Sequence, residues 1–118
     1  MNKKYIDKLI PKAIEQLNSL VKNGSIDKVY QGYLASFGPT VIQSGLLQTV
    51  MFYTADENKN QVIKIMYELI KDDLNATQNS MKDFLIENQN YKNHTIKNKI
   101  LEANIACKLS IRTFDLKD

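Results

Sequence analysis

The chain has 118 residues, of which 43% are hydrophobic and 25% are charged. This length suits one domain over residues 1–118, is too short for two independent cores, and comes with a composition that argues against disorder. The formal net charge of +3 at pH 7 is mildly basic, which alone is weak support for a nucleic-acid partner.

Turn-forming residues are scarce, because the chain has only four Gly and two Pro, and this favours long helices over many short strands. The spacing of apolar residues predicts a first helix over Tyr5–Val21. Pro11 lies inside this pattern, where it either kinks the helix or marks the start of its regular part. Asn23-Gly24-Ser25 is typical of a helix stop, with Gly24 supplying a left-handed cap.

Three helices are expected in the middle of the chain. The first covers Asp27–Ser36 and is broken by Gly38-Pro39, and Pro39 then starts a short helix over Thr40–Ser44. The third helix covers Leu46–Ala55, and its run Leu46–Tyr53 is apolar on most sides, which predicts the most buried element of the fold. A buried strand has the same appearance at this length, but no second strand candidate exists to pair with it.

The C-terminal half predicts three further helices. A polar turn at Asp56–Asn60 precedes the first of them, which covers Asn60–Asn75. The second covers Ser80–Glu87, and the third follows a polar loop and covers Thr95–Leu116, with Thr95 as N-cap. The last is predicted to be long and amphipathic. At 100° per residue its apolar residues share one arc: Ile96, Ile100, Ala103, Cys107, Ile111 and Phe114. The expected fold is therefore all-α, a compact bundle of about five to seven helices.

Groups capable of catalysis are few. His94 is the single histidine and lies in a polar stretch, so a surface role is expected. Cys107 lies on the apolar arc of the last helix, which predicts a buried, inert thiol. Asp72 and Asp73 are adjacent, and neighbours on a helix point about 100° apart, so they do not converge on a metal. We expect no enzyme activity, no metal and no cofactor.

The single cysteine excludes an intramolecular disulfide and suggests a reducing compartment. The residues from Met1 to Asp7 lack the apolar run of a signal peptide, and no stretch approaches the roughly 18 apolar residues that span a membrane. A cytoplasmic location is the resulting expectation.

A segment without charge runs from Gln31 to Ala55. Packing explains most of its apolar residues but not its run of uncharged polar ones. Such a segment is either fully buried or meets another protein. The candidate interface residues are Gln43, Ser44, Gln48 and Thr49.

Three features of the sequence resemble the small α-helical subunit of the type III-B CRISPR RNA-guided effector complex, the Cmr module. The first is a helix with Tyr30 and Tyr33 that leads into Ser36-Phe37. The second is Ile42-Gln43-x-Gly45-Leu46-x-x-Thr49-x-x-Phe52-Tyr53, and the third is the basic C-terminal helix. The resemblance in length and helical pattern covers the whole chain, but the specific part is Tyr30–Tyr53. That family usually has proline directly after the residue matching Phe37, where this chain has Gly38.

The resemblance implies a non-enzymatic subunit, several copies of which stack beside the backbone subunits and help hold target RNA paired with guide RNA. Its partners would be other Cmr subunits and the two RNAs, the latter through phosphates. Fifteen of the 16 basic residues are Lys, which suits diffuse phosphate contact. The candidate RNA contacts are Lys97, Lys108 and Arg112, which share an arc of the last helix, with Lys4, Lys8 and Lys12. The alternative is a helical protein-binding module or homo-oligomer that does not contact RNA.

Overall fold

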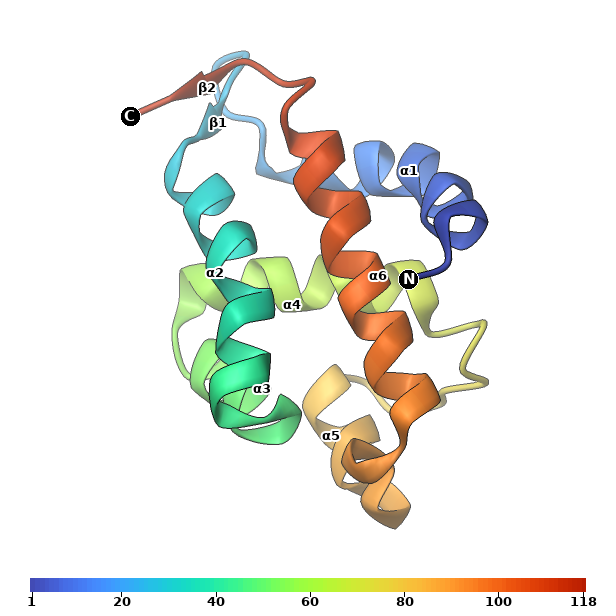
Figure 1. Ribbon diagram of the computed structural model, residues 1–118. Helices are drawn as coiled ribbons and strands as arrows, with labels where there is room; N and C mark the ends of the chain where they lie inside the picture. The colour runs from blue at the N-terminus through green and yellow to red at the C-terminus, as the bar shows by residue number, and fades with distance from the viewer.

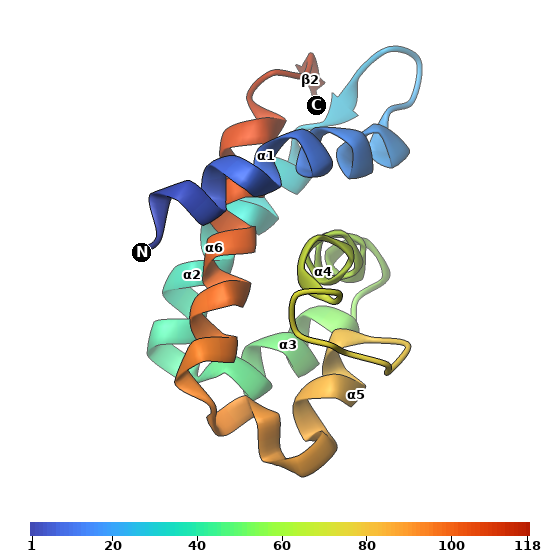
Figure 2. The ribbon, with the colours of Figure 1, turned by 90° about the vertical axis from the view of Figure 1, so that its right-hand side faces the viewer.

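Helix α6 (His94–Ile111) is the element against which the other long helices pack. In the computed structural model, which describes residues 1–118, α1 (Lys3–Leu17) crosses one side of α6 and α2 (Val29–Ser44) runs beside it. Helix α4 (Glu57–Ile70) crosses behind α2 and α6 in the view of Figure 1, and Figure 2 shows it to one side of them. The prediction of a compact helical bundle with a long C-terminal helix is confirmed.

Shorter elements close the two ends of this arrangement. At one end lie α3 (Leu46–Thr54), α5 (Met81–Ile86) and the 3₁₀ helix η2 (Glu87–Lys92), seen at the bottom of Figure 2. At the other end, the 3₁₀ helix η1 (Asn18–Leu20) follows α1, and two short strands, β1 (Ile26–Asp27) and β2 (Leu116–Lys117), pair in parallel. No helix combines the length and the apolar character that a membrane crossing requires.

The buried apolar side chains form one cluster of 27 residues, to which α6 contributes Ile100, Ala103, Cys107 and Ile111 from its predicted arc. Helix α6 is nevertheless less amphipathic than predicted. Three polar residues are also buried, because α1, α2 and α4 cover more of the helix than the predicted arc. Asn104 and Ser110 flank the arc, and Glu102 lies further round the helix.

Each buried polar residue of α6 has a partner on another element. The Asn104 Nδ2 donates a hydrogen bond to the Leu34 carbonyl at 3.0 Å, and the Glu102 carboxylate accepts one from the Asn2 backbone N–H at 2.7 Å. No buried side-chain nitrogen or oxygen in the chain lacks a hydrogen-bond partner. Because an unpaired buried polar group is costly, these bonds fix the positions of α2 and of the N-terminus against α6.

The helix break predicted at Gly38-Pro39 is wrong, because α2 continues through Pro39. Proline has no N–H to bond the carbonyl of Ala35, four residues earlier. Pro39 and Ala35 are both exposed, so water can bond that carbonyl. Burial of Phe37 and Val41 on the opposite face offsets the lost hydrogen bond. The expected helix Thr40–Ser44 is therefore the end of α2.

The last helix ends at Ile111, before the predicted end at Leu116. Leu116 instead pairs with Ile26, whose side chain is fully buried, and the Lys28 N–H donates to the Lys117 carbonyl at 2.8 Å. The strands were not predicted, because a two-residue strand shows no alternating pattern. Their pairing holds the end of α6 beside the start of α2.

Other helix ends also differ from the predicted ones. The predicted turn Asp56–Asn60 is mostly the first turn of α4, because the Asp56 carboxylate accepts the N–H groups of Asn58 and Lys59. Helix α4 ends at Ile70, and the N-cap of α6 is Asn93 in place of Thr95. Gly24 has the predicted left-handed conformation, with a φ of 81°, but within the turn Lys22–Ser25 and not directly at the end of α1.

We expect Asn104→Ala to lower the free energy of unfolding by about 1–3 kcal/mol, because it removes a buried hydrogen bond between α6 and α2. Urea unfolding followed by circular dichroism measures this loss. The matched control is Asn98→Ala on the exposed side of the same helix, which is expected to change stability by less than about 0.5 kcal/mol. Equal midpoints for the two variants would contradict the role given to Asn104.

Candidate functional site

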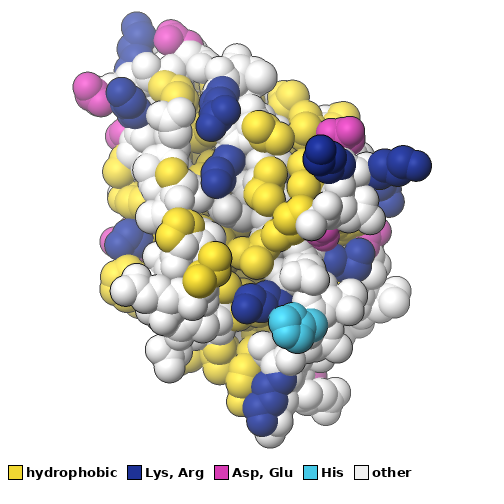
Figure 3. All heavy atoms as spheres, viewed as in Figure 1, with side chains coloured by type: hydrophobic (Ala, Val, Ile, Leu, Met, Phe, Trp, Pro, Cys, Tyr) yellow, Lys and Arg dark blue, Asp and Glu magenta, His cyan; other side chains and the backbone are white.

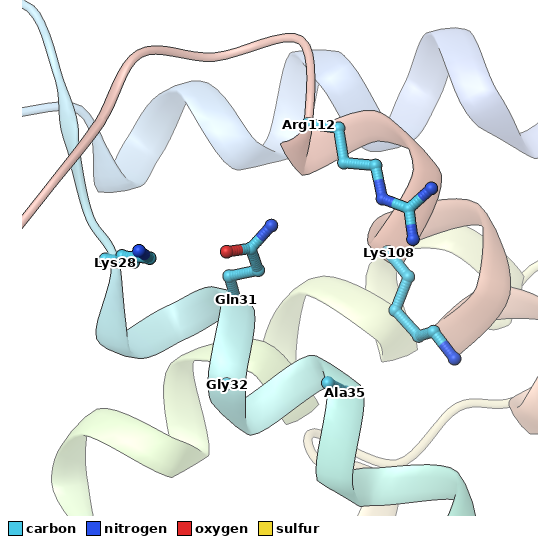
Figure 4. Close-up of a pocket in the computed structure, with 6 residues that line it drawn as sticks. All are labelled: Lys28, Gln31, Gly32, Ala35, Lys108 and Arg112. Atoms are coloured by element: carbon cyan, nitrogen blue, oxygen red, sulfur yellow. The ribbon is translucent and has the colours of Figure 1, made fainter.

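A basic pocket of about 350 Å³ lies between α2 and α6. Lys28, Gln31, Gly32 and Ala35 line it from the start of α2, and Lys108 and Arg112 line it from the last turns of α6 (Figure 4). The β1–β2 pairing positions these walls, because β1 directly precedes Lys28 and β2 follows shortly after Arg112. Lys28 thus lines the same pocket as Lys108 and Arg112, which follow it by 80 and 84 positions in the sequence.

None of the three cations in this pocket is neutralised by the protein. The chain has two ion pairs within 4.0 Å, Lys8 with Asp73 and Lys71 with Glu68, and neither touches the pocket. No carboxylate lines it, and a Cβ added at Gly32 would meet nothing within 4 Å. The pocket therefore offers positive charge and an open stretch of backbone to an anionic ligand.

Lys97 lies further along the same side of α6, about 17 Å from Lys108 at 1.5 Å per residue. It lines a second pocket, which joins the corner between α2 and α3 to the start of α6. This corner pocket is lined by Ser44, Gly45, Leu46, Leu47, Gln48, Tyr91, Lys92, Asn93, His94 and Lys97. Figure 3 shows dark blue Lys and Arg side chains following one another down this face of the molecule, in the region of α2 and α6.

The N-terminal lysines do not join either pocket. Lys8 lies 4.0 Å from Asp73 and 5.9 Å from the centre of the Tyr5 ring. Lys4 and Lys12 are exposed on the same helix, α1. The RNA contacts predicted for these three lysines stay a prediction. Sequence reasoning missed Lys28, which the β1–β2 pairing brings to the first pocket, and Lys92, which lies in η2 shortly before α6 and lines the corner pocket.

The candidate interface residues divide into exposed and buried ones. Gln43, Ser44 and Gln48 are exposed, whereas Thr49 is 1% exposed and donates its hydroxyl to the Gly45 carbonyl at 2.7 Å. Thr49 therefore does not belong to the surface, since its hydroxyl is used inside α3. Its predicted role as an interface residue reflects the polarity of threonine and not its position on the helix.

Large apolar side chains in the charge-free segment are exposed, which corrects the prediction that Leu46–Ala55 is the most buried element. Ile42 on α2 is 79% exposed, and Met51 and Phe52 on α3 are 48% and 62% exposed. Lys59 lies 4.5 Å from the centre of the Phe52 ring. Of the two readings of this segment, full burial is excluded.

Other aromatic residues of the segment are structural. The Tyr53 hydroxyl donates to the Tyr33 carbonyl at 2.8 Å and lies 2.8 Å from the Ser36 hydroxyl, while its ring packs edge-on against Phe37. Burial raises the pKa of Tyr53 above its usual value. These contacts fasten α3 to α2 and leave the phenol no catalytic task.

Reactive groups are not gathered anywhere in the structure. His94 is exposed, and no group of three His, Cys, Asp or Glu side chains is placed to hold a metal ion. Asp73 accepts a hydrogen bond from the Tyr5 hydroxyl at 2.6 Å, on the side of the molecule occupied by α1. Cys107 is buried, and this burial raises the pKa of its thiol from 9.0 to about 12.

We expect the Cys107 thiol to resist Ellman's reagent at pH 8 in the folded protein and to react fully in denaturant. Because its pKa is raised on folding, its contribution to stability is complete below pH 9 and is lost as the pH rises toward 12. Release of the chromophore with and without urea measures the reactivity. Rapid, complete reaction of the folded protein would contradict the assigned burial.

The fold and the two pockets define a small helical protein with lysines and an arginine along one side of α2 and α6. Residues 7–111 match the family model of the CRISPR-associated protein Cas_Cmr5, so the chain belongs to this family. No curated protein and no solved structure matches the chain. Family membership implies a subunit of the type III-B CRISPR, or Cmr, complex that associates with other Cmr subunits; members are generally small and non-catalytic.

Proposed function

We propose that this protein is a non-catalytic structural subunit of a cytoplasmic type III-B CRISPR ribonucleoprotein in antiviral defence. It stacks along the backbone subunits and helps hold guide or target RNA through phosphate contacts. The observation that supports the RNA contact is that Lys28, Lys108 and Arg112 line one pocket, which no Asp or Glu lines, and that none of them forms an ion pair. Lys97 extends this path along α6.

Phosphate is the ligand that this chemistry favours. Two of the three cations in the pocket are lysines, which act on phosphate as mobile point charges, and the open backbone at Gly32 admits a bulky anion. Contacts of this kind position a nucleic acid without reading its sequence. They suit a complex in which base pairing with the guide supplies the specificity.

We expect the triple variant Lys28→Gln, Lys108→Gln and Arg112→Gln to weaken RNA binding by the assembled complex. If each cation neutralises one phosphate of a single strand, the slope of log affinity against log salt falls by about 2. Filter binding at several salt concentrations gives both quantities. The same titration separates this function from a protein-binding module without RNA contact, for which neither quantity changes.

The matched control neutralises three lysines elsewhere, Lys3, Lys64 and Lys82, which gives the same change in net charge. We expect it to leave the salt slope within about 0.5 of the wild-type value, since these lysines line neither basic pocket. Equal slopes for the two triple variants would remove the α2–α6 pocket from the RNA path.

In this proposal the charge-free segment, Gln31–Ala55, makes the contact with neighbouring subunits. Ile42, Met51 and Phe52 are exposed there, together with the polar residue Gln43. Depletion of charge with exposed aromatic, Met and aliphatic side chains is typical of the centre of a protein interface. The same composition is unfavourable for a surface that faces water.

We expect Phe52→Ser to reduce incorporation of this subunit into the complex, because it removes an apolar anchor worth about 2 kcal/mol or more when buried at an interface. The measurement is the subunit stoichiometry of complexes purified through a different, tagged Cmr subunit. Ile86→Ser is the control, since Ile86 is similarly exposed at 52% but lies on α5, outside the segment. Normal stoichiometry with Phe52→Ser would exclude this site from the interface.

A further inference from the structure

We propose that the corner pocket binds one unpaired nucleotide of an RNA strand, with its base against Tyr91 and its phosphate toward Lys97. This inference rests on the proposed RNA contact of the α2–α6 face and adds a second, chemically different site to it. The corner pocket has a volume of about 540 Å³, which falls in the range of pockets that hold small ligands.

The walls of the corner pocket supply the three kinds of contact that a nucleotide requires. Tyr91 and Leu47 are half-buried and offer aromatic and apolar surface to a planar base. Ser44 and Gln48 are exposed and offer a hydroxyl and an amide to the hydrogen-bonding edge of the base. Lys92 and Lys97 supply positive charge for a phosphate.

The absence of acidic side chains narrows the choice of ligand. No Asp or Glu lines the corner pocket, so a cationic ligand finds no partner there. An inorganic anion would use the two lysines and leave the aromatic and amide groups without a task. The combination of aromatic, amide and cationic groups therefore favours a nucleotide over a cationic ligand and over an inorganic anion.

The backbone on both sides of the corner pocket holds unusual conformations. Gly45 has a φ of 93°, which a residue with a Cβ rarely adopts, and it makes the corner between α2 and α3. Asn88 and Gln89, just before Tyr91, have φ values of 51° and 55°, although both carry side chains. Residues with a Cβ rarely adopt this left-handed conformation. The hydrogen bond from the Asn90 amide to the Phe84 carbonyl, at 2.8 Å, helps hold this turn, which places Tyr91 and Lys92 opposite Gln48.

The distance between the two basic pockets fits a single strand that reaches both. Lys97 and Lys108 lie on the same side of α6, about 17 Å apart. A stacked strand covers this distance in about five nucleotides at 3.4 Å each. A base enters a concave pocket only after leaving its stack, so the corner pocket selects an unpaired position, whereas a duplex would offer its phosphates alone.

The test compares two octamers that carry the same charge, octauridylate RNA and an abasic ribose-phosphate octamer, for binding to the full chain. We expect the wild-type chain to bind the octauridylate about 10-fold more tightly, as for one stacked base. Tyr91→Leu is expected to abolish this preference with an unchanged salt slope, and Tyr91→Phe to retain it. Gln48→Ala, at an exposed position, is expected to reduce it, and thermal unfolding shows whether each variant is folded.

Equal binding of the two octamers by the wild-type chain overturns the proposal, as does a full preference in both Tyr91→Leu and Gln48→Ala. Failure to bind either octamer overturns it too. None of these results bears on the phosphate contacts of Lys28, Lys108 and Arg112, whose effect is measured as a salt slope in the assembled complex. The triple variant can show the expected fall in the slope of log affinity against log salt while the wild-type chain binds the two octamers equally. This pair of results rejects the nucleotide pocket and leaves the phosphate contacts in place.

Discussion

The close packing of α2 against α6 is the constraint on which the rest of the structure depends. The two helices are joined by the bond from Asn104 to the Leu34 carbonyl, and a Cβ added at Gly38 would be in ordinary contact with the Asn104 Oδ1, at 3.7 Å. The start of α2 lies beside the end of α6, where the β1–β2 pairing joins the two segments. The core and the basic pocket therefore share this interface between helices, and the β1–β2 pairing adds Lys28 to the pocket.

The sequence predicted the helices well because their signal is local. Apolar spacing is visible within a few turns, so the existence and approximate bounds of α1, α3 and α6 could be inferred. The predicted break at Gly38-Pro39 was wrong because the loss of one hydrogen bond is local, whereas the burial of Phe37 and Val41 that outweighs it depends on the helices packed against α2, among them α3 with Tyr53. Tertiary packing can outweigh the low helix propensity of a proline where the carbonyl that loses its backbone hydrogen bond is exposed to water.

The candidate site was only half predictable for the same reason. Lys108 and Arg112 share an arc of one helix, and helix geometry alone brings them together. Lys28 joins them through the pairing of β1 with β2, whose two-residue strands carry no pattern. The segment from Gln31 to Ala55 signals an unusual surface by its lack of charge, but charge alone cannot tell buried Thr49 from exposed Phe52. The positions of Thr49 and Phe52 around α3 determine which of the two side chains is buried.

The two proposed surfaces depend on each other energetically. Binding that rests on a few lysine–phosphate contacts has dissociation constants of about 10⁻⁴ to 10⁻⁶ M at physiological salt, so one isolated copy with three clustered cations holds RNA weakly. Affinity rises steeply when contacts are linked, because each further contact is made at high effective concentration. An exposed apolar segment that fixes the chain beside its neighbours would supply this linkage. The weakness of the single basic pocket is then an advantage, since a strand held by many weak contacts can be exchanged one contact at a time.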